Sequence, residues 1–249
     1  MKIFRAKKVY FFFSALFAFM LHLPFAFSGT KSFSFKKGIT TPAVLQGEHT
    51  VSAVSKMYDS LKLNLSGLSH EAFDYAIKGY EYLKSKGKIT NQNVLSIADF
   101  TKPSSAKRLF VLDLKNYKIL FNTYVAHGQG SGAAMATQYS NTPESYQSSM
   151  GFYTTSDTYI GKNGYSMHLE GMEKGINDKA LERAIVMHGA PYVSENFIHS
   201  RGYLGRSWGC PAVPEQLNKP IIDKIRNGSC LFIFSGSSKY LNTSQIINS

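Results

Sequence analysis

A histidine and a cysteine, each beside a glycine, constrain this chain more than any other feature. His188 and Gly189 end a short apolar run, and Cys210 follows Gly209 in a Ser-x-Gly-Cys-Pro loop. A free thiol has a pKa of about 8.5, so it needs a nearby imidazole to become a thiolate near neutral pH. A fold that uses both groups must therefore bring residues 188 and 210 together.

The pattern indicates nucleophilic catalysis by Cys210. Gly209 has no side chain, which lets a substrate carbonyl approach. The backbone N–H groups of Ser207, Trp208, Gly209 and Cys210 are candidate donors to an oxyanion. His188 would act as general base and then as acid toward the leaving amine. The structural alternatives are a cysteine in a tight turn and a core histidine at a strand end.

These residues resemble the L,D-transpeptidase (YkuD-like) family, whose motif is His-Gly, a spacer and then Ser/Thr-His-Gly-Cys. In this chain Trp208 stands in place of the second His, and Arg206 precedes Cys210 where many members have an Arg after the Cys. The chain looks like a divergent murein L,D-transpeptidase catalytic domain, and the resemblance covers roughly residues 51 to 234. Further segments that carry it are 98–100, 125–128, 149–153 and 171–178.

The resemblance implies an exported cysteine acyltransferase that acts on peptidoglycan stem peptides through a thioester on Cys210. The carbonyl of Gly189 would orient the ring of His188, no cofactor is implied, and carbapenems would acylate the thiol. Arg206 is a candidate to bind a stem carboxylate, or else a solvated surface residue. His127 either lines the groove, replaces the missing motif His or packs in the core. With water as acceptor, the same site would be an L,D-carboxypeptidase or hydrolase. A non-catalytic wall-binding protein is the alternative from another class.

The N-terminus has the form of an export signal. Basic residues in 2–8 precede an apolar run over 9–23, and small residues at 26–28 suit a signal peptidase. We expect residues 1–28 to be removed and the protein to be periplasmic or associated with the cell envelope. The alternative is a retained anchor, although the run is short for a span of about 20 residues. No Cys lies nearby, which excludes a lipoprotein.

The chain is strongly basic, with a formal net charge of +12. Such a charge draws an exported protein to anionic polymers, lipid headgroups or acidic stem peptides. Nucleic acid is the other usual partner of a basic protein, but the sequence has no recognition motif for it. Simple solubility is the remaining interpretation of the charge.

Two cysteines in an exported chain raise the alternative of a disulfide. Cys230 lies in the apolar run 229–234, which predicts a buried strand, and a bridge to Cys210 would silence the nucleophile. A zinc site is the other alternative, and it would make Cys210 a ligand. No close spacing such as His-x-x-x-His supports it, so we expect no metal. The groups considered are Cys210, His127, His168, His188 and His199.

The period of the apolar residues divides the chain. We expect a linker at 29–47, a helical extension at 48–90 whose two helices form a hairpin, a catalytic domain at 91–236 and a flexible tail at 237–249. From Val94 the period changes to that of strands. The prediction is a mainly β domain with helices (α+β), and the resemblance implies a β-sandwich-like fold with a groove. Expected helices also run from Asn177 to Arg183 and over 214–226. Tyr192 and Asn141 are weaker site candidates.

Overall fold

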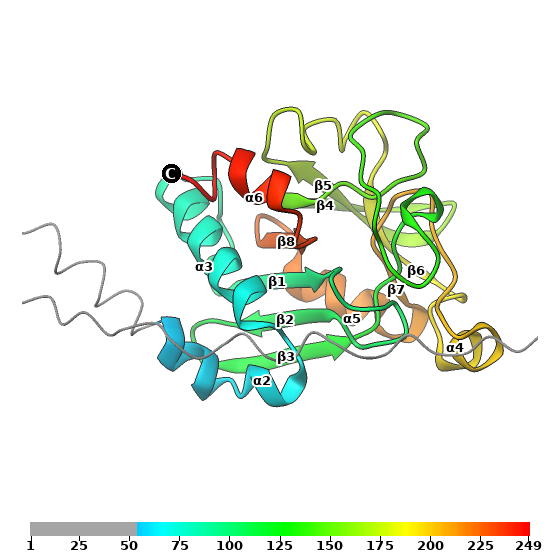
Figure 1. Ribbon diagram of the computed structural model, residues 1–249, viewed down its shortest axis with the longest axis horizontal. Coiled ribbons are helices and arrows are strands. Elements are labelled where there is room, and N and C mark those ends of the chain that lie inside the picture. The colour runs from blue at the N-terminus through cyan, green and yellow to red at the C-terminus, as the bar shows by residue number, and fades with distance from the viewer. Residues whose placement is uncertain (1–53) are drawn as a thin grey trace, which may run out of the picture. The chain divides into compact units, whose positions relative to one another are not determined.

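The computed structural model describes residues 54–249 (Figure 1). The expected signal peptide, the linker and the first residues of the helical extension lie outside these described residues. In the described part, a helical segment at 54–60 is followed by α2 (Leu63–Ser66) and α3 (His70–Ser85). No helix of the described part is long and apolar enough to cross a membrane.

One eight-stranded sheet forms the centre of the molecule, in the order β3-β2-β1-β8-β4-β5-β6-β7. Its pairs are antiparallel except β1 with β8 and β6 with β7, which are parallel. A bridge between Ala126 and Ala212 joins the segment after β3 to β7 at the opposite edge, so the sheet curls toward closure. The predicted class, mainly β with helices and sandwich-like, is confirmed. The strands are β1 (Val94–Asp99), β2 (Leu109–Asp113), β3 (Lys118–Thr123), β4 (Gly151–Gly161), β5 (Gly164–Gly171), β6 (Val186–Ala190), β7 (Ala212–Pro214) and β8 (Cys230–Phe234).

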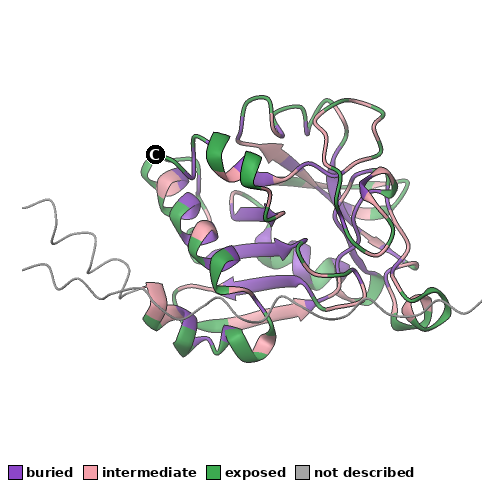
Figure 2. Ribbon diagram, in the orientation of Figure 1, coloured by how far each residue is buried: buried purple, intermediate pink, exposed green. Residues whose placement is uncertain are grey.

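Helix α3 covers one face of this sheet. The Ser69 side chain caps the helix by accepting from Ala72 N at 3.2 Å. The apolar stripe of the helix packs into one buried cluster with Phe152 and Phe232, whose rings stack at 4.1 Å. A Cβ at Gly79 would lie 2.0 Å from the Phe152 ring, so glycine permits the close approach of helix and sheet. Figure 2 shows the buried strands and the half-buried helix. The helical extension thus shares a core with the eight-stranded sheet.

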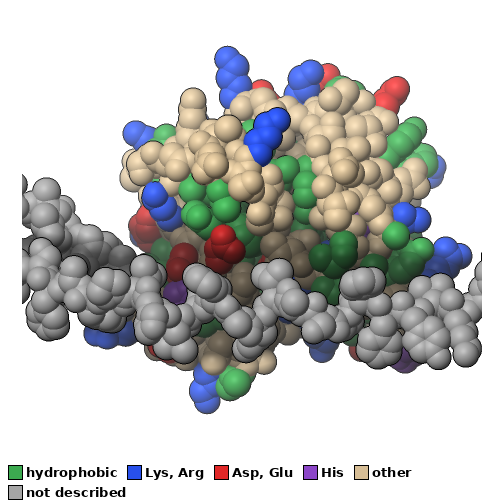
Figure 3. Space-filling model, viewed as in Figure 1, with side chains coloured by type: hydrophobic (Ala, Val, Ile, Leu, Met, Phe, Trp, Pro, Cys, Tyr) green, Lys and Arg blue, Asp and Glu red, His purple; other side chains and the backbone are tan. Residues whose placement is uncertain are grey.

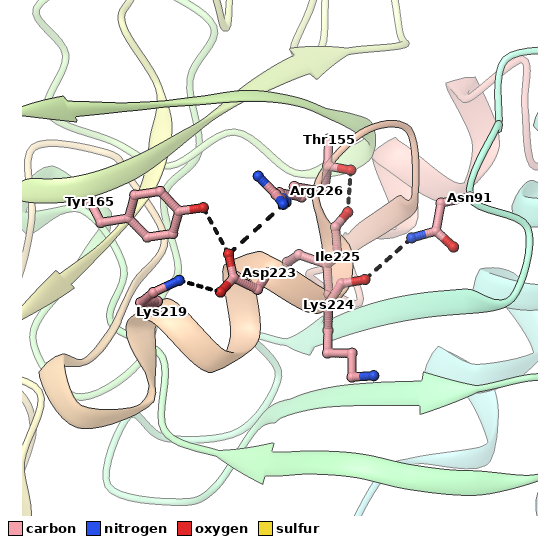
Figure 4. A network of polar contacts seen from close by, with 8 residues as sticks. All are labelled: Asn91, Thr155, Tyr165, Lys219, Asp223, Lys224, Ile225 and Arg226. Atoms are coloured by element: carbon pink, nitrogen blue, oxygen red, sulfur yellow. Dashed lines mark hydrogen bonds and ion pairs between the residues drawn. The ribbon is translucent and has the colours of Figure 1, made fainter.

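Helix α5 (Glu215–Ile225) covers the other face, where it packs against β1, β5, β6 and β7 and buries its isoleucines. Figure 4 shows the polar contacts around it. Asp223 accepts from Tyr165 Oη at 2.8 Å and pairs with Lys219, while Ile225 O accepts from Thr155 Oγ1 at 2.5 Å. Exposed ion pairs contribute about 0–1 kcal/mol, so the apolar face accounts for most of the docking.

The expectation of a flexible tail at 237–249 is wrong. Helix α6 (Ser238–Thr243) forms there, and Tyr240, Ile246 and Ile247 are buried. Tyr240 Oη donates to Glu173 Oε2 at 2.8 Å. Three apolar residues in a polar segment are enough to dock it, because each buries its side chain against the α3 side of the sheet.

Four further elements differ from the sequence-based expectation. The segment 177–183 forms successive turns rather than a helix, because Asn177 accepts from Glu173 N at 2.9 Å and donates to Phe152 O at 2.9 Å. The short strand β7 and helix α4 (Glu195–Arg201) were not expected. Between residues 128 and 143 the expected loop contains a 3-10 turn, η1 (Gln129–Ser131).

Candidate active site

Strand β6 carries the predicted histidine, and its backbone contacts the predicted cysteine. The two strands are parallel, with His188 opposite Ala212. Two residues earlier on each segment lie Val186 and Cys210, and Val186 N is 3.5 Å from Cys210 Sγ. The thiol therefore lies against the backbone of β6, the strand that carries His188.

The ring of His188 is held by its own backbone neighbour. Nδ1 lies 2.9 Å from Gly189 O, and because a carbonyl only accepts, Nδ1 carries the proton. This is the contact that the family resemblance implied for the Gly189 carbonyl. The other nitrogen, Nε2, has no hydrogen-bond partner among the described residues and is left as a base. Burial lowers the pKa of His188, although the Gly189 carbonyl opposes it, so the neutral ring is favoured.

Cys210 is half-buried at the end of its loop, and both cysteines are free thiols. Its Sγ lies 3.7 Å from Ala184 O. Burial raises the pKa of the thiol, while the Val186 N–H and the Arg183 guanidinium act in the opposite direction. The resting cysteine is thus a thiol that requires a base.

In the loop before Cys210, two of the four predicted oxyanion donors already donate hydrogen bonds within the protein. Ser207 N donates to His127 O at 3.0 Å, and Gly209 N donates to Ser207 Oγ at 3.1 Å. Ser207 Oγ in turn donates to Cys210 O at 2.6 Å. The N–H groups of Trp208 and Cys210 have no partner in the part of the chain described, so they remain available for an oxyanion. Gly209 has φ 123°, which a side chain would strain.

A family model described as an L,D-transpeptidase catalytic domain matches residues 64–234. The chain belongs to this family. The match contains both His188 and Cys210 and most of the helical extension, which agrees with the shared core. A search of curated proteins found no match.

Several solved structures are similar to this L,D-transpeptidase domain. An L,D-transpeptidase from Mycobacterium smegmatis is 13% identical with a TM-score of 0.36, and the match covers 57% of this chain and 59% of that one. The helical cell shape determining protein from Campylobacter jejuni is 12% identical with a TM-score of 0.41, covering 65% and 57%. An L,D-transpeptidase from Stackebrandtia nassauensis is 15% identical with a TM-score of 0.34, covering 75% and 78%.

Trp208, at the position of the second motif His, is 69% exposed, and its ring centroid lies 5.6 Å from that of Tyr146. It therefore walls the surface beside Cys210 and does not pack beneath the loop. Arg206 donates from Nη1 to Gly132 O at 3.0 Å and lies over the Tyr203 ring. Arg206 thus links the Cys210 loop to the loop that contains Gly132. This contact was not among the expectations for Arg206, which were a site for a stem carboxylate or a solvated surface residue.

His127 is a core residue whose side chain is fully buried, so it does not line a surface groove. Its Nδ1 lies 2.7 Å from Arg108 Nη2, and both residues are fully buried. Burial and the Arg108 charge lower the pKa of His127 to about 4, so the ring is neutral. Its carbonyl accepts from Ser207, which makes His127 a support of the Cys210 loop. Arg108 gave no signal in the sequence, because an isolated Arg before a strand is usually at the surface.

The two weaker site candidates, Tyr192 and Asn141, lie in different surroundings. Tyr192 is half-buried near Cys210, and burial together with the Cys210 charge raises the pKa of Tyr192 to about 12. Asn141 instead links two loops, since its Nδ2 donates to Asp178 Oδ1 at 2.7 Å. Among residues 54–249, no group of three or more His, Cys, Asp or Glu side chains is arranged to hold a metal ion.

Proposed function

We propose that this protein is a peptidoglycan L,D-transpeptidase in which Cys210 is the nucleophile and His188 the base. The observation that carries the proposal is the hydrogen bond from His188 Nδ1 to Gly189 O, at 2.9 Å, on the strand beside the Cys210 thiol. It fixes the tautomer with a free Nε2, as proton removal from a thiol requires.

In the first half of the proposed reaction, Nε2 of His188 takes the thiol proton and Cys210 Sγ attacks the carbonyl carbon of the third residue of a stem tetrapeptide. The N–H groups of Trp208 and Cys210 stabilise the oxyanion. The amide bond to the terminal D-Ala then breaks, and the leaving amine takes the proton from His188. A thioester on Cys210 remains.

In the second half, the side-chain amine of a second stem attacks the thioester carbon and gives its proton to His188. The C–S bond breaks, and the thiol is restored as a three-to-three cross-link is released. Water in place of the amine would give a tripeptide by the same steps.

We propose further that the protein works outside the cytoplasm. The basic and apolar start of the sequence supports this location. Lys and Arg side chains are spread over the face drawn in Figure 3, as suits attraction to an anionic wall. N-terminal sequencing of the extracytoplasmic form should find a chain that begins near Gly29. A membrane fraction that retains Met1 would favour the anchor instead.

The decisive experiment is a digest of purified peptidoglycan by the mature protein, read by mass spectrometry, with the Cys210→Ala protein as control. Three-to-three dimers with loss of D-Ala would establish transpeptidation. Tripeptides alone would establish the carboxypeptidase. Unchanged stems, at a concentration where the protein binds the wall, would contradict both and favour a binding protein.

A further inference from the structure

Arg183 lies in the turn that leads into β6, on the segment whose backbone contacts the Cys210 thiol. Ala184, the next residue, has φ 51°, an uncommon conformation for a residue with a side chain. Its carbonyl is the one 3.7 Å from Cys210 Sγ. The strained turn thus places the backbone around Arg183 directly against the nucleophile, and such strain is commonest at functional sites.

The guanidinium of Arg183 forms hydrogen bonds with the loop over residues 140–149, which packs against the Cys210 loop. Nη1 donates to Ser140 O at 2.7 Å and to Ser149 Oγ, and Nη2 donates to Gln147 O at 2.6 Å. The same loop reaches the nucleophile segment, because Ser148 Oγ donates to Gly209 O at 3.0 Å. A Cβ at Gly209 would lie 3.3 Å from Arg183 Nη2, so the charge lies beside the residue that precedes Cys210.

This charge has no carboxylate partner. All four hydrogen-bond acceptors of Arg183 are carbonyl or hydroxyl oxygens, and in the described part of the chain it takes part in no ion pair. Arg206, the cation nearer in sequence, is instead turned to Gly132. The half-buried Arg183 therefore offers an uncompensated positive charge at the place where Cys210 must become negative.

The other titratable groups of this region, within the described part of the chain, do not supply a positive charge to stabilise the Cys210 thiolate. His188 on β6 is favoured in its neutral form by burial. Tyr192, which faces Cys210, and Tyr153 on β4, which faces Arg183, are neutral phenols with raised pKa values. Burial of the thiol disfavours a resting thiolate–imidazolium pair. From this geometry we infer that Arg183 is a positioning residue that anchors the loop behind Gly209 and stabilises the Cys210 thiolate. This inference deepens the proposed function and rests on Cys210 being its nucleophile.

The test uses the pH dependence of Cys210 alkylation by iodoacetamide, which requires no peptidoglycan activity and so separates this inference from the proposed function. In Arg183→Gln, the pKa read from the alkylation profile should rise by about 1 pH unit, with a roughly tenfold slower reaction at pH 7. Arg183→Lys keeps the charge and should restore most of the profile. Arg201→Gln, on the exposed end of α4, is the matched control and should react as the parent does.

Ser149→Ala provides a second measurement if Arg183→Gln does not fold. It removes one partner of the guanidinium and retains the charge, so the profile should be unchanged. An alkylation profile in folded Arg183→Gln that overlays the parent would overturn the inference. So would an Arg183→Lys profile shifted as far as that of Arg183→Gln, or a Ser149→Ala profile shifted as far as either.

Discussion

Cys210 lies half-buried where its loop meets β7, whereas Cys230 is enclosed at the start of β8, between β1 and β4. Burial raises the pKa of both thiols. At Cys210 the Val186 N–H and the Arg183 charge oppose this effect, while at Cys230 the nearby Glu173 carboxylate adds to it. The same side chain thus becomes a candidate nucleophile or an inert core group according to its polar neighbours.

Replacing each cysteine in turn should give the largest difference between the two sites. Cys210→Ala should abolish turnover of stem peptides while the protein stays folded, because the change removes one atom from a partly exposed loop. Cys230→Ala should keep full turnover. Product analysis by mass spectrometry, beside circular dichroism of both variants, measures this. Residual turnover in folded Cys210→Ala would exclude the thioester mechanism.

His188→Ala tests whether the base belongs to the Cys210 end alone. The rate of thioester formation should fall by about 10²- to 10⁴-fold, the usual contribution of a positioned acid–base group. Single-turnover kinetics at pH 7 measures it. His199→Ala, on the exposed α4, is the control and should leave the rate unchanged. An equal loss in both variants would mean that His188 is not the specific base.

The buried His127, whose carbonyl supports the Cys210 loop, should make the stability of the protein sensitive to acid. Its pKa in the folded protein is about 4, below the unfolded value of about 6.5, so the unfolded chain binds more protons between these pH values. The associated stability is complete above pH 6.5 and is lost as the pH falls through 4. Between pH 7 and pH 5 the loss should be about 2 kcal/mol.

His127→Gln should show a smaller decrease over that interval, even though its stability at pH 7 is lower through the lost contact with Arg108. Urea unfolding at both pH values measures the difference, and comparison of the two proteins cancels the titration of other groups. Parallel decreases in both would show that His127 does not titrate as described.

Cys230→Ala should have the smallest effect, on stability alone. The side chain is fully buried beside Phe232 on β8, so the variant leaves a small cavity and should lose about 1–2 kcal/mol of unfolding free energy. Cys230→Ser should lose more, because it buries a hydroxyl in the same place. Chemical denaturation of the three proteins checks this order. An unchanged midpoint in both variants would mean that Cys230 is not packed as the structure places it.

The sequence predicted the strands because their apolar residues and turns are local signals. The motif also predicted His188 and Cys210 as site residues, since each stands beside a glycine, and Cys210 Sγ lies 3.5 Å from Val186 N on the strand that carries His188. Arg183, Arg108 and β7 could not be found in the same way. Their roles depend on which loop lies across from them, and one residue type at one position carries no such information.

The tail shows the opposite error. Polar residues at 237–249 predicted a loose segment, but Tyr240, Ile246 and Ile247 bury their side chains in the α3 side of the core. The hydroxyl of Tyr240 is paired with Glu173, a residue distant in the sequence. A few well-placed apolar contacts outweigh average composition, because burial stabilises each side chain separately.

Acylation by a β-lactam tests most directly which cysteine is the nucleophile. The strained amide of a carbapenem mimics the scissile bond, and its opening develops the same oxyanion. Intact-mass and peptide mass spectrometry of the full mature chain should show one adduct, located on Cys210, formed more slowly in His188→Ala. Labelling at Cys230, or an adduct that forms equally fast in His188→Ala, would contradict the account of the Cys210–His188 pair.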